Sequence, residues 1–237
     1  MWFYNFGVHI VTESQVVPQF FTWTEDVASR GSTEVASSLL TLLEFNETLR
    51  RYFKVIEYKF PEVGHSYLDS DFGRINKNLR KHETIFRPEK YREIVMKSGR
   101  NHYVTDMTAH IRNFKDLHNK LQLTNRKRNF LNEKVAFRDS VKWIRVEEFG
   151  SYLYKYCYDP YTPFKKVDLR KHIRGVKQRF KIGDFELKRT TDAGAKLTAE
   201  KIENIEQQLL FIKKEYDFFY ESVIQKEKQS INTLHWV

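Results

Sequence analysis

The pattern of apolar and polar positions predicts three strands in the first sixty residues. Residues 3–11 and 19–24 are rich in aromatic and β-branched side chains, which suit the interior of a sheet. A polar, proline-containing turn at residues 12–18 separates these two runs. Residues 52–60 alternate between polar and apolar side chains, which indicates a third strand. The N-terminal part of the chain is therefore expected to contain a sheet.

Apolar side chains are spaced as in a helix between these predicted strands and also after them. Residues 34–50 place apolar side chains three or four positions apart, and Ser32 or Thr33 can cap the start of the predicted helix. These apolar side chains are Val35, Leu39, Leu42 and Leu43. Residues 72–82 and 88–99 are also typical of helices, and the second begins with a proline, whose missing N–H costs little in a first turn.

Three later runs are typical of strands: residues 102–107, 141–149 and 151–158. The period of two in the last run places four side chains on one face, namely Tyr152, Tyr154, Tyr156 and Tyr158. One hypothesis is that these rings stack on nucleic-acid bases. The alternative, which we favour, is that they pack against a helix and show their hydroxyl groups to water.

The C-terminal segment, residues 196–230, predicts a long amphipathic helix. Its apolar stripe steps by threes and fours along one face, through Ile202, Ile205, Leu209, Ile212, Tyr216, Phe219 and Val223. Thr198 can cap the helix, and Glu200 lies near its positive end. Because the polar residues beyond the stripe show no sustained charge complementarity, we expect docking on the same domain rather than a coiled coil. A protein partner or self-association through the stripe is the alternative.

Composition limits the classes that the chain can belong to. With 237 residues, 41% hydrophobic and 15% aromatic, the chain can build a packed core. A single cysteine, Cys157, excludes an internal disulfide and a zinc site built mainly from thiolates. No apolar run approaches the roughly 18 residues needed to span a bilayer. We therefore expect an intracellular protein without a membrane segment, located in the nucleus or the cytoplasm.

The net charge of +10 is concentrated in one region of the chain. Residues 112–189 carry 21 Lys and Arg against 9 Asp and Glu, whereas the remainder is close to neutral. Interleaved aromatic and basic residues are typical of nucleic-acid binding, so DNA is the expected partner. The alternative is a solvated basic face with no partner. The candidate DNA-binding residues are Arg126, Lys127, Arg128, Lys142, Arg145, Lys165, Lys166, Arg170, Lys171, Arg174, Lys177, Arg179 and Lys181.

A short stretch, GHSYLDSDFGRI at residues 64–75, carries the candidate catalytic chemistry. Asp69 and Asp71 are two positions apart, with His65 before them. If the backbone is extended there, both carboxylates point to one side and could share a divalent cation, with His65 as a further weak ligand candidate. Two carboxylates alone rarely hold a metal for catalysis. Spacing by itself therefore favours a turn at the end of a strand.

Four blocks of the sequence, in order, resemble an uncharacterised transposase-like domain of animal mobile-element proteins. They are MWFYNFGVHI, FFTWTEDVASRGSTEVASSLL, YKFPEVGHSYLDSDFGRI and LTAEKIENIEQQLLFIKKEYDFFY. The resemblance extends from residue 2 to about residue 223 and is weakest in the basic region. It implies an RNase H-like fold and a DDE-type active site, in which acidic residues of a sheet hold two Mg²⁺ or Mn²⁺ ions for cutting and joining DNA.

Carried over residue by residue, the resemblance implies an active site that is not intact. Relatives have an acidic strand before the Tyr-Asn-x-Gly-x-His block, with which this chain begins. They have a second one, with a Ser-Asp-Asn motif, between the elements expected at 34–50 and 52–60. Asn76 stands where relatives have a glutamate, and its neutral carbonyl is a weaker metal ligand than a carboxylate. Asp69 and Asp71 are then vestigial, in a chain expected to be truncated and internally deleted.

The combined expectation is an α/β protein with an incomplete RNase H-like mixed sheet and flanking helices, followed by a basic α+β region and a long C-terminal amphipathic helix. Residues 1–122 would form the remnant RNase H-like domain. Residues 123–195 would form the basic, aromatic-rich region. Residues 196–230 would form a helix that packs on the core.

Three functional hypotheses follow. The first is a transposon-derived protein that is catalytically inactive, needs no cofactor and retains DNA binding. The second is an active nuclease or transposase that uses Mg²⁺ or Mn²⁺, with Glu25 or Glu34 supplying the missing carboxylates beside Asp69 and Asp71. The third is a protein-interaction module without affinity for nucleic acid, acting through the C-terminal stripe or the tyrosine face.

Overall fold

The chain folds into two compact units, each of which contains one β-sheet. The computed structural model describes residues 1–11, 13–45, 55–60, 67–114, 127–148, 150–170, 187–190 and 196–234. The first unit comprises Met1–Thr41, Tyr67–Arg112 and Arg189–Val237, and the second comprises Leu42–Ser66 and Asn113–Lys188. These units interleave along the chain, in contrast to the three consecutive ranges predicted from the sequence. The predicted mixed α/β class is confirmed.

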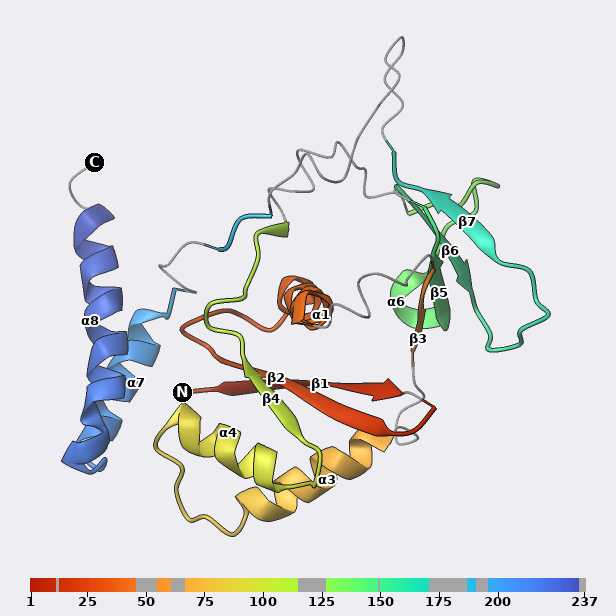
Figure 1. Ribbon diagram of the computed structural model, residues 1–237. Helices are drawn as coiled ribbons and strands as arrows, with labels where there is room; N and C mark the ends of the chain where they lie inside the picture. The colour runs from red at the N-terminus through yellow and green to blue at the C-terminus, as the bar shows by residue number, and fades with distance from the viewer. Residues whose placement is uncertain are drawn as a thin grey trace. The chain divides into compact units, whose positions relative to one another are not determined.

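The sheet of the first unit contains three strands in the order β1-β2-β4 (Figure 1). Strands β1 (Phe3–Val11) and β2 (Val16–Thr24) pair antiparallel, and β4 (Tyr103–Asp106) pairs parallel with β2. All three predicted strands are confirmed. Strand β2 begins at Val16, so the turn is shorter than predicted and Pro18 lies within the strand. Pairing with β4 starts only at Gln19, so the missing N–H of Pro18 leaves no gap in that ladder.

Helices cover both faces of this sheet, as Figure 1 shows. Helices α3 (Tyr67–Leu79) and α4 (Pro88–Lys97) lie on one face and α1 (Ser32–Phe45) on the other. The predicted helices that begin near Ser32 and at Pro88 are confirmed, and residues 46–50 of the first prediction lie outside the described residues. The core beneath α3 and α4 is built on Phe20, Ile75 and Val95.

Helix α1 turns its small polar side chains inward. The buried residues are Glu34, Ser37, Ser38 and Thr41, whereas the predicted apolar positions Val35, Leu39, Leu42 and Leu43 are only half-buried. The serine hydroxyl groups donate to carbonyl groups one turn earlier, Ser37 to Thr33 at 2.8 Å and Ser38 to Glu34 at 2.9 Å. Hydroxyl groups satisfied within their own helix can be buried at low cost. The residues that helix α1 buries are therefore small polar ones rather than the apolar residues whose spacing predicted the helix.

The second unit contains a four-stranded antiparallel sheet in the order β3-β5-β6-β7. Its strands are β3 (Ile56–Lys59), β5 (Trp143–Val146), β6 (Ser151–Lys155) and β7 (Lys165–Asp168), with the short helix α6 (Phe137–Ser140) beside them. Its core is Val135, Val141, Tyr154 and Val167. The strand predicted at residues 52–60 is confirmed as β3, but it lies in a different sheet from β1 and β2.

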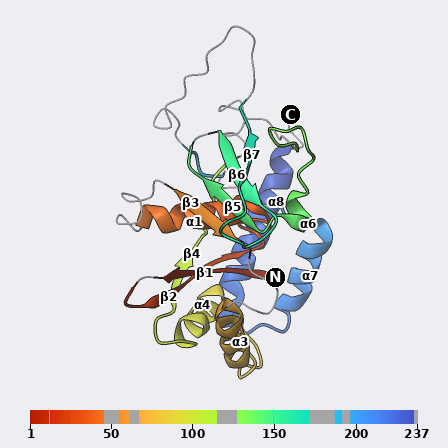
Figure 2. The ribbon, with the colours of Figure 1, turned by 90° about the vertical axis from the view of Figure 1, so that its right-hand side faces the viewer.

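The C-terminal segment is helical, as predicted, but it is not one continuous helix. Helices α7 (Ala199–Leu209) and α8 (Asp217–Leu234) run side by side, joined through the 3₁₀ turn η2 (Lys214–Tyr216), as both ribbon views show (Figures 1 and 2). Folding back lets Ile202 and Ile205 pack against Tyr220 and Ile224, which a straight helix would keep apart. The predicted cap is confirmed, because Thr198 Oγ1 accepts from the Lys201 N–H at 3.2 Å.

The apolar stripe of this helical hairpin packs within the first unit. Tyr220 Oη donates to the Phe86 carbonyl at 2.6 Å, and the Tyr216 ring stacks on Phe86 with centroids 5.2 Å apart. Within the described part of the chain, no helix is both long and apolar enough to cross a membrane.

Candidate functional site: the buried Asp71 cluster

The paired aspartates lie in a helix rather than in a turn. Helix α3 begins at Tyr67, which places both Asp69 and Asp71 inside it. Side chains two positions apart on an α-helix point about 200° away from each other. Accordingly, Asp69 is exposed, whereas only 2% of Asp71 is exposed. The predicted turn and the extended pair of carboxylates are both wrong, and the two aspartates are not placed to share a cation. His65 lies outside the described residues.

The apolar residues around the motif explain why it is helical. Leu68, Phe72, Ile75 and Leu79 recur at intervals of four, three and four, and they pack on Phe20 of β2. The rings of Phe72 and Phe20 meet edge to face with centroids 5.7 Å apart. This packing extends the helix backwards through the aspartates, whereas the local glycines and aspartates on their own favour a turn.

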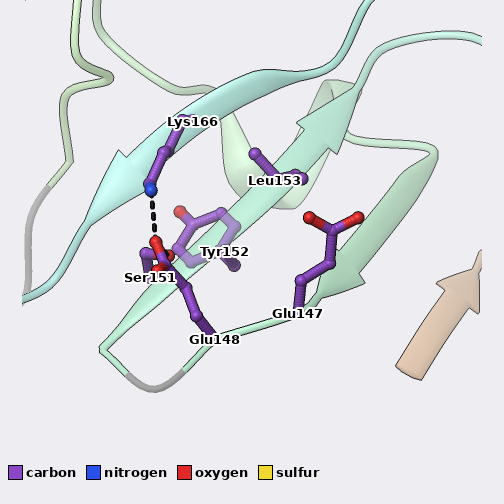
Figure 3. A pocket seen from close by; sticks show the side chains of 6 residues that line it. All are labelled: Glu147, Glu148, Ser151, Tyr152, Leu153 and Lys166. Atoms are coloured by element: carbon purple, nitrogen blue, oxygen red, sulfur yellow. Dashed lines mark hydrogen bonds and ion pairs between the residues drawn. The ribbon is translucent and has the colours of Figure 1, made fainter. Parts of the chain in front are cut away.

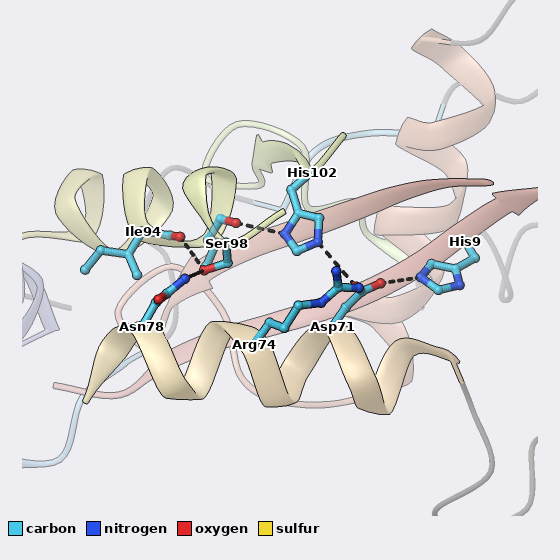
Figure 4. Close-up of polar contacts among 8 residues, drawn as sticks. His9, Asp71, Arg74, Asn78, Ile94, Ser98 and His102 are labelled. Atoms are coloured by element: carbon cyan, nitrogen blue, oxygen red, sulfur yellow. Dashed lines mark hydrogen bonds and ion pairs between the residues drawn. The ribbon is translucent and has the colours of Figure 1, made fainter. Parts of the chain in front are cut away.

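Three side chains contact the Asp71 carboxylate, and Figure 4 shows how they converge. His9 Nε2 lies 2.7 Å from Asp71 Oδ2, and His102 Nε2 lies 3.4 Å from Oδ1. The Arg74 guanidinium also donates to Oδ1. We refer to His9, Asp71, Arg74 and His102 as the Asp71 cluster.

The Asp71 cluster joins three segments that are distant in the sequence. His9 comes from β1, Asp71 and Arg74 come from α3, and His102 directly precedes β4. His9 and Asp71 are 62 positions apart, and His102 and Asp71 are 31 apart. No motif spacing connects residues so far apart, so Arg74 and His102 were not predicted. The sequence alone offered His9 as a metal ligand or, by preference, as a hydrogen-bonded structural residue beside a strand, and its bond to Asp71 agrees with the structural role. The signal available in the sequence was that His9 and His102 each lie in a predicted strand, residues 3–11 and 102–107.

The electrostatics of the cluster keep Asp71 ionised. Burial on its own raises the pKa of a carboxyl group, and for Asp71 it is the largest single influence. The hydrogen bond from His9, the charge of Arg74 and the contact with His102 together outweigh it, so the pKa of Asp71 is below its ordinary value. The cluster is therefore a buried carboxylate with its own counter-charges.

His102 is held in place by backbone on two sides. Because a carbonyl oxygen only accepts, His102 Nδ1 donates to the Val95 carbonyl, 2.9 Å away. The ring lies across Gly99, where an added Cβ would stand 2.3 Å from Nε2. Glycine at this position is what allows His102 to reach Asp71.

A second polar contact beside the cluster fastens α3 to the end of α4 (Figure 4). Asn78 Nδ2 donates to Ser98 Oγ at 3.0 Å, and Ser98 Oγ donates to the Ile94 carbonyl at 2.6 Å. Asn78 lies two turns after Asp71 on the same side of α3. The two contacts together fix the orientation of this helix.

This arrangement does not fit a metal site. A metal-binding carboxylate must direct free lone pairs at the ion, but both oxygens of Asp71 already accept from neighbours. The Arg74 guanidinium beside Oδ1 would also repel a divalent cation. Asn76, at the position expected to bear the last carboxylate, is exposed and makes no part of the cluster. The Asp71 cluster is instead suited to holding β1, α3 and the start of β4 together.

The other carboxylates considered as metal ligands are engaged elsewhere in the first unit. Glu25 accepts from the Trp2 N–H at 2.7 Å and from Lys201 Nζ at 3.0 Å. Glu34 is buried on α1 and accepts from Ser29 Oγ at 3.2 Å. Across the described residues, no group of three or more His, Cys, Asp and Glu side chains is arranged to hold a metal ion.

Most of the described DNA-binding candidates have acidic neighbours. Four form ion pairs in the second unit: Arg145 with Glu57, Lys165 with Glu133, Lys166 with Glu148, and Arg170 with Asp168. Lys127 and Arg128 are exposed on a loop, and Lys142 is half-buried. Six other candidates lie outside the described residues: Arg126, Lys171, Arg174, Lys177, Arg179 and Lys181. Of the described candidates, Lys127 and Arg128 are thus best placed to meet phosphate.

Of the four tyrosines predicted to share one face, Tyr154 is part of the core of the second unit. Strand β6 ends at Lys155, so only Tyr152 and Tyr154 belong to it. Tyr154 is fully buried, and its hydroxyl accepts from Asn129 Nδ2 at 3.2 Å, which means that this group is not in water as we had expected. Burial and the neighbouring Tyr156 raise the pKa of Tyr154 to about 12. Its ring is not accessible for stacking on a base.

A pocket of about 380 Å³ opens beside the β5–β6 turn (Figure 3). Its charged residues already have partners, because Glu148 contacts Lys166 and Ser151, and Glu147 contacts Arg145. The bond from Lys166, followed by that from Ser151, lowers the pKa of Glu148. The pocket therefore offers no free charge with which to recognise a ligand.

Comparisons with protein-family models, with curated proteins and with solved structures found no match for this chain. The resemblance to a transposase-like family therefore rests on the sequence blocks alone.

Proposed function

We propose that this chain is a transposon-derived, RNase H-like protein that has no metal-dependent nuclease activity and binds DNA in the nucleus. The observation that carries the proposal is the Asp71 cluster. In a DDE-type site, the corresponding carboxylate would have to face a metal ion, whereas in this chain it is buried and saturated by His9 and Arg74.

The arrangement of the first unit supports the RNase H-like part of the proposal. An antiparallel pair, β1 and β2, leads into a helix on one face, and a parallel strand and two further helices complete the layers. Of the resembling blocks, the first two fall on β1, β2 and α1, the third runs from β3 of the other sheet into α3, and the fourth falls on α7, η2 and the start of α8. A mixed sheet enclosed by helices on both faces is the architecture that the resemblance implies.

DNA binding is supported by the charge of the chain, which is +10 overall and concentrated in residues 112–189. We expect the full chain to shift a DNA oligonucleotide in a mobility assay, with affinity falling at least about 10-fold between roughly 50 and 200 mM salt, because binding releases counterions. The same preparation should leave supercoiled plasmid intact in Mg²⁺ or Mn²⁺.

Two results would contradict this proposal. Absence of any salt-sensitive binding would remove the DNA-binding part. Nicking that is lost in a folded Asp71→Asn variant, and is kept in Asp69→Asn, would show that Asp71 serves catalysis after all. Folding of each variant is checked by its thermal unfolding curve.

A specific feature favours protein interaction as a second candidate function. Three large apolar side chains at the closed end of the helical hairpin are more than four-fifths exposed: Leu210, Phe211 and Phe218. Such exposed apolar residues, when contiguous, mark interaction sites. Leu209 and Ile212, by contrast, pack into the hairpin and support its fold.

For this candidate we expect Phe211→Asp to abolish co-purification of a protein partner, or self-association in sedimentation, without changing the unfolding midpoint. Leu209→Asp serves as the matched comparison, since it should lower the midpoint by disrupting the hairpin core. If both substitutions leave association unchanged, the hairpin is not an interaction site.

A further inference from the structure

Residues 127–135 of the second unit form a tight, closed loop, which we call the Phe130 loop. Its two ends are bonded to each other, since the Val135 N–H donates to the Lys127 carbonyl at 2.8 Å and the Asn129 N–H donates to the Glu133 carbonyl at 2.9 Å. Arg128 and Lys134 face each other as an antiparallel bridge. Asn132 takes a positive φ of 64°, a conformation that asparagine tolerates better than most residues.

The Phe130 loop is anchored on the four-stranded sheet through Asn129. This side chain is buried, and its Nδ2 donates to Tyr154 Oη at 3.2 Å on β6, while its Oδ1 accepts from the Glu133 N–H at 2.9 Å. The Phe130 N–H donates to the Lys166 carbonyl of β7 at 2.9 Å. The loop is therefore held to the sheet by the Asn129 side chain and by the Phe130 backbone, not by the Phe130 side chain.

The tip of the loop presents two apolar side chains to solvent. Phe130 is 82% exposed and Leu131 is 70% exposed. Two adjacent large apolar side chains that stay in water on a well-bonded loop leave the free energy of burying them unused. That free energy is available to a partner that covers the tip.

The charges around the tip indicate the chemistry of the partner. Lys127, Arg128 and Lys134 are all exposed on the loop. Its one acidic residue, Glu133, is turned to the base, where it accepts from Asn129 and from Lys165 Nζ at 2.8 Å. The loop thus carries an exposed aromatic ring and three exposed cations, which is complementary to a ligand that combines a flat apolar face with negative charge.

We propose that the Phe130 loop contacts nucleic acid, with the Phe130 ring stacked on an unpaired base and Lys127 and Lys134 on the adjacent phosphates. This inference rests on the proposed DNA binding and assigns the residues that make it. Aromatic rings stack on every base, and lysines neutralise the backbone on either side. Leu131, next to the ring, is the kind of side chain that wedges between bases.

A membrane surface is the competing anionic partner, and the geometry favours nucleic acid. Binding to a lipid interface takes an extended apolar face, such as one side of an amphipathic helix. The Phe130 loop offers only two exposed apolar side chains on a closed turn, not such an extended face.

The test uses the full chain and a single-stranded oligonucleotide that carries 2-aminopurine, whose fluorescence is quenched by stacking. Phe130→Ala should weaken binding on the order of 10-fold and change the fluorescence response, because base stacking on an aromatic side chain is worth about 1–3 kcal/mol. Phe130→Trp should retain both. The matched control is Tyr161→Ala, since Tyr161 is 92% exposed in the same unit but lies outside the Phe130 loop, with its N–H bonded to Asp159.

The cations are tested separately from the ring. Lys127→Ala and Lys134→Ala should each reduce the salt dependence of binding by about one ion while leaving the fluorescence response of the bound oligonucleotide in place. Arg128 is avoided as a probe because its guanidinium donates to the Asn132 carbonyl at 2.7 Å and supports the loop.

The outcomes separate this inference from the proposed function. If the wild type binds with steep salt dependence and Phe130→Ala binds equally well, the Phe130 loop is not the contact, while DNA binding stands. If the wild type does not bind at all, the proposed function fails and this inference fails with it. If Phe130→Ala loses binding to phosphatidylserine vesicles but not to the oligonucleotide, the loop is a lipid-contacting element and the assignment to nucleic acid is wrong.

Discussion

Asp71→Ala should destabilise the protein by about 3 kcal/mol, because it removes the buried carboxylate that His9 and Arg74 bond and that His102 contacts inside the first unit. His9 and His102 would each be left with an Nε2 atom facing a cavity. The lost contact with Arg74 contributes less to the destabilisation, since 59% of the Arg74 side chain is exposed and its guanidinium can be hydrated instead. Urea unfolding at neutral pH measures the difference.

Asp69→Ala is the matched control for this substitution. It removes the same chemical group from the same helix, but from an exposed position near the positive end, where the expected loss is within about 1 kcal/mol. Equal losses for the two variants would show that Asp71 has no special structural role.

The contribution of Asp71 should also depend on pH. Because its pKa is lower in the folded protein than in the unfolded chain, its stabilising effect is complete above the unfolded value of about 3.9 and is lost as the pH falls through the folded value. The difference in unfolding free energy between the wild type and Asp71→Asn should therefore be largest at neutral pH and should shrink below about pH 4. A difference that grows on acidification would contradict the assignment.

Tyr154→Ala should be the most damaging substitution in the second unit, at about 3–5 kcal/mol, as for other large aromatic residues removed from a core. Tyr154 is fully buried and packs in the cluster with Val135, Val141 and Val167. Its hydroxyl also receives the bond from Asn129 that anchors the Phe130 loop. Thermal or urea unfolding of the full chain would measure the loss.

Tyr154→Phe separates the two roles of this residue. It keeps the ring in the core and leaves Asn129 short of one acceptor, so we expect a loss of about 1–2 kcal/mol and a looser Phe130 loop. Hydrogen exchange at the Phe130 amide reports on the loop directly. Unchanged exchange in a variant that is still destabilised would mean that the anchoring bond does not control the loop.

Local periodicity was a sound guide to which segments form strands and helices. The runs that became β1, β2, β4, β5 and β6 are short and rich in aromatic and β-branched residues, and Pro88 marked the start of α4. Thr198 likewise identified the start of α7. These features depend on neighbouring residues, so they can be read along the chain without knowledge of the fold.

The same reading failed where two patterns competed for one segment. Around Asp71, closely spaced glycine and aspartate indicated a turn, while Leu68, Phe72 and Ile75 were spaced for a helix. The segment is helical because burying this apolar face against Phe20 contributes more free energy than the local preference for a turn. In the C-terminal segment, an uninterrupted stripe predicted one helix, and only the packing of Ile205 against Tyr220 and Ile224 shows why it folds back.

Taken by itself, the sequence determined the mixed α/β class, most of the secondary structure, the position of the basic region and the presence of Asp69 and Asp71 two positions apart. Tertiary structure alone decided that Asp71 is buried between His9, Arg74 and His102 while Asp69 faces solvent, and that Phe130 stands exposed on an anchored loop. The reason is physical: secondary structure follows from interactions over a few residues, whereas burial and charge pairing depend on side chains brought together from 31 or 62 positions away.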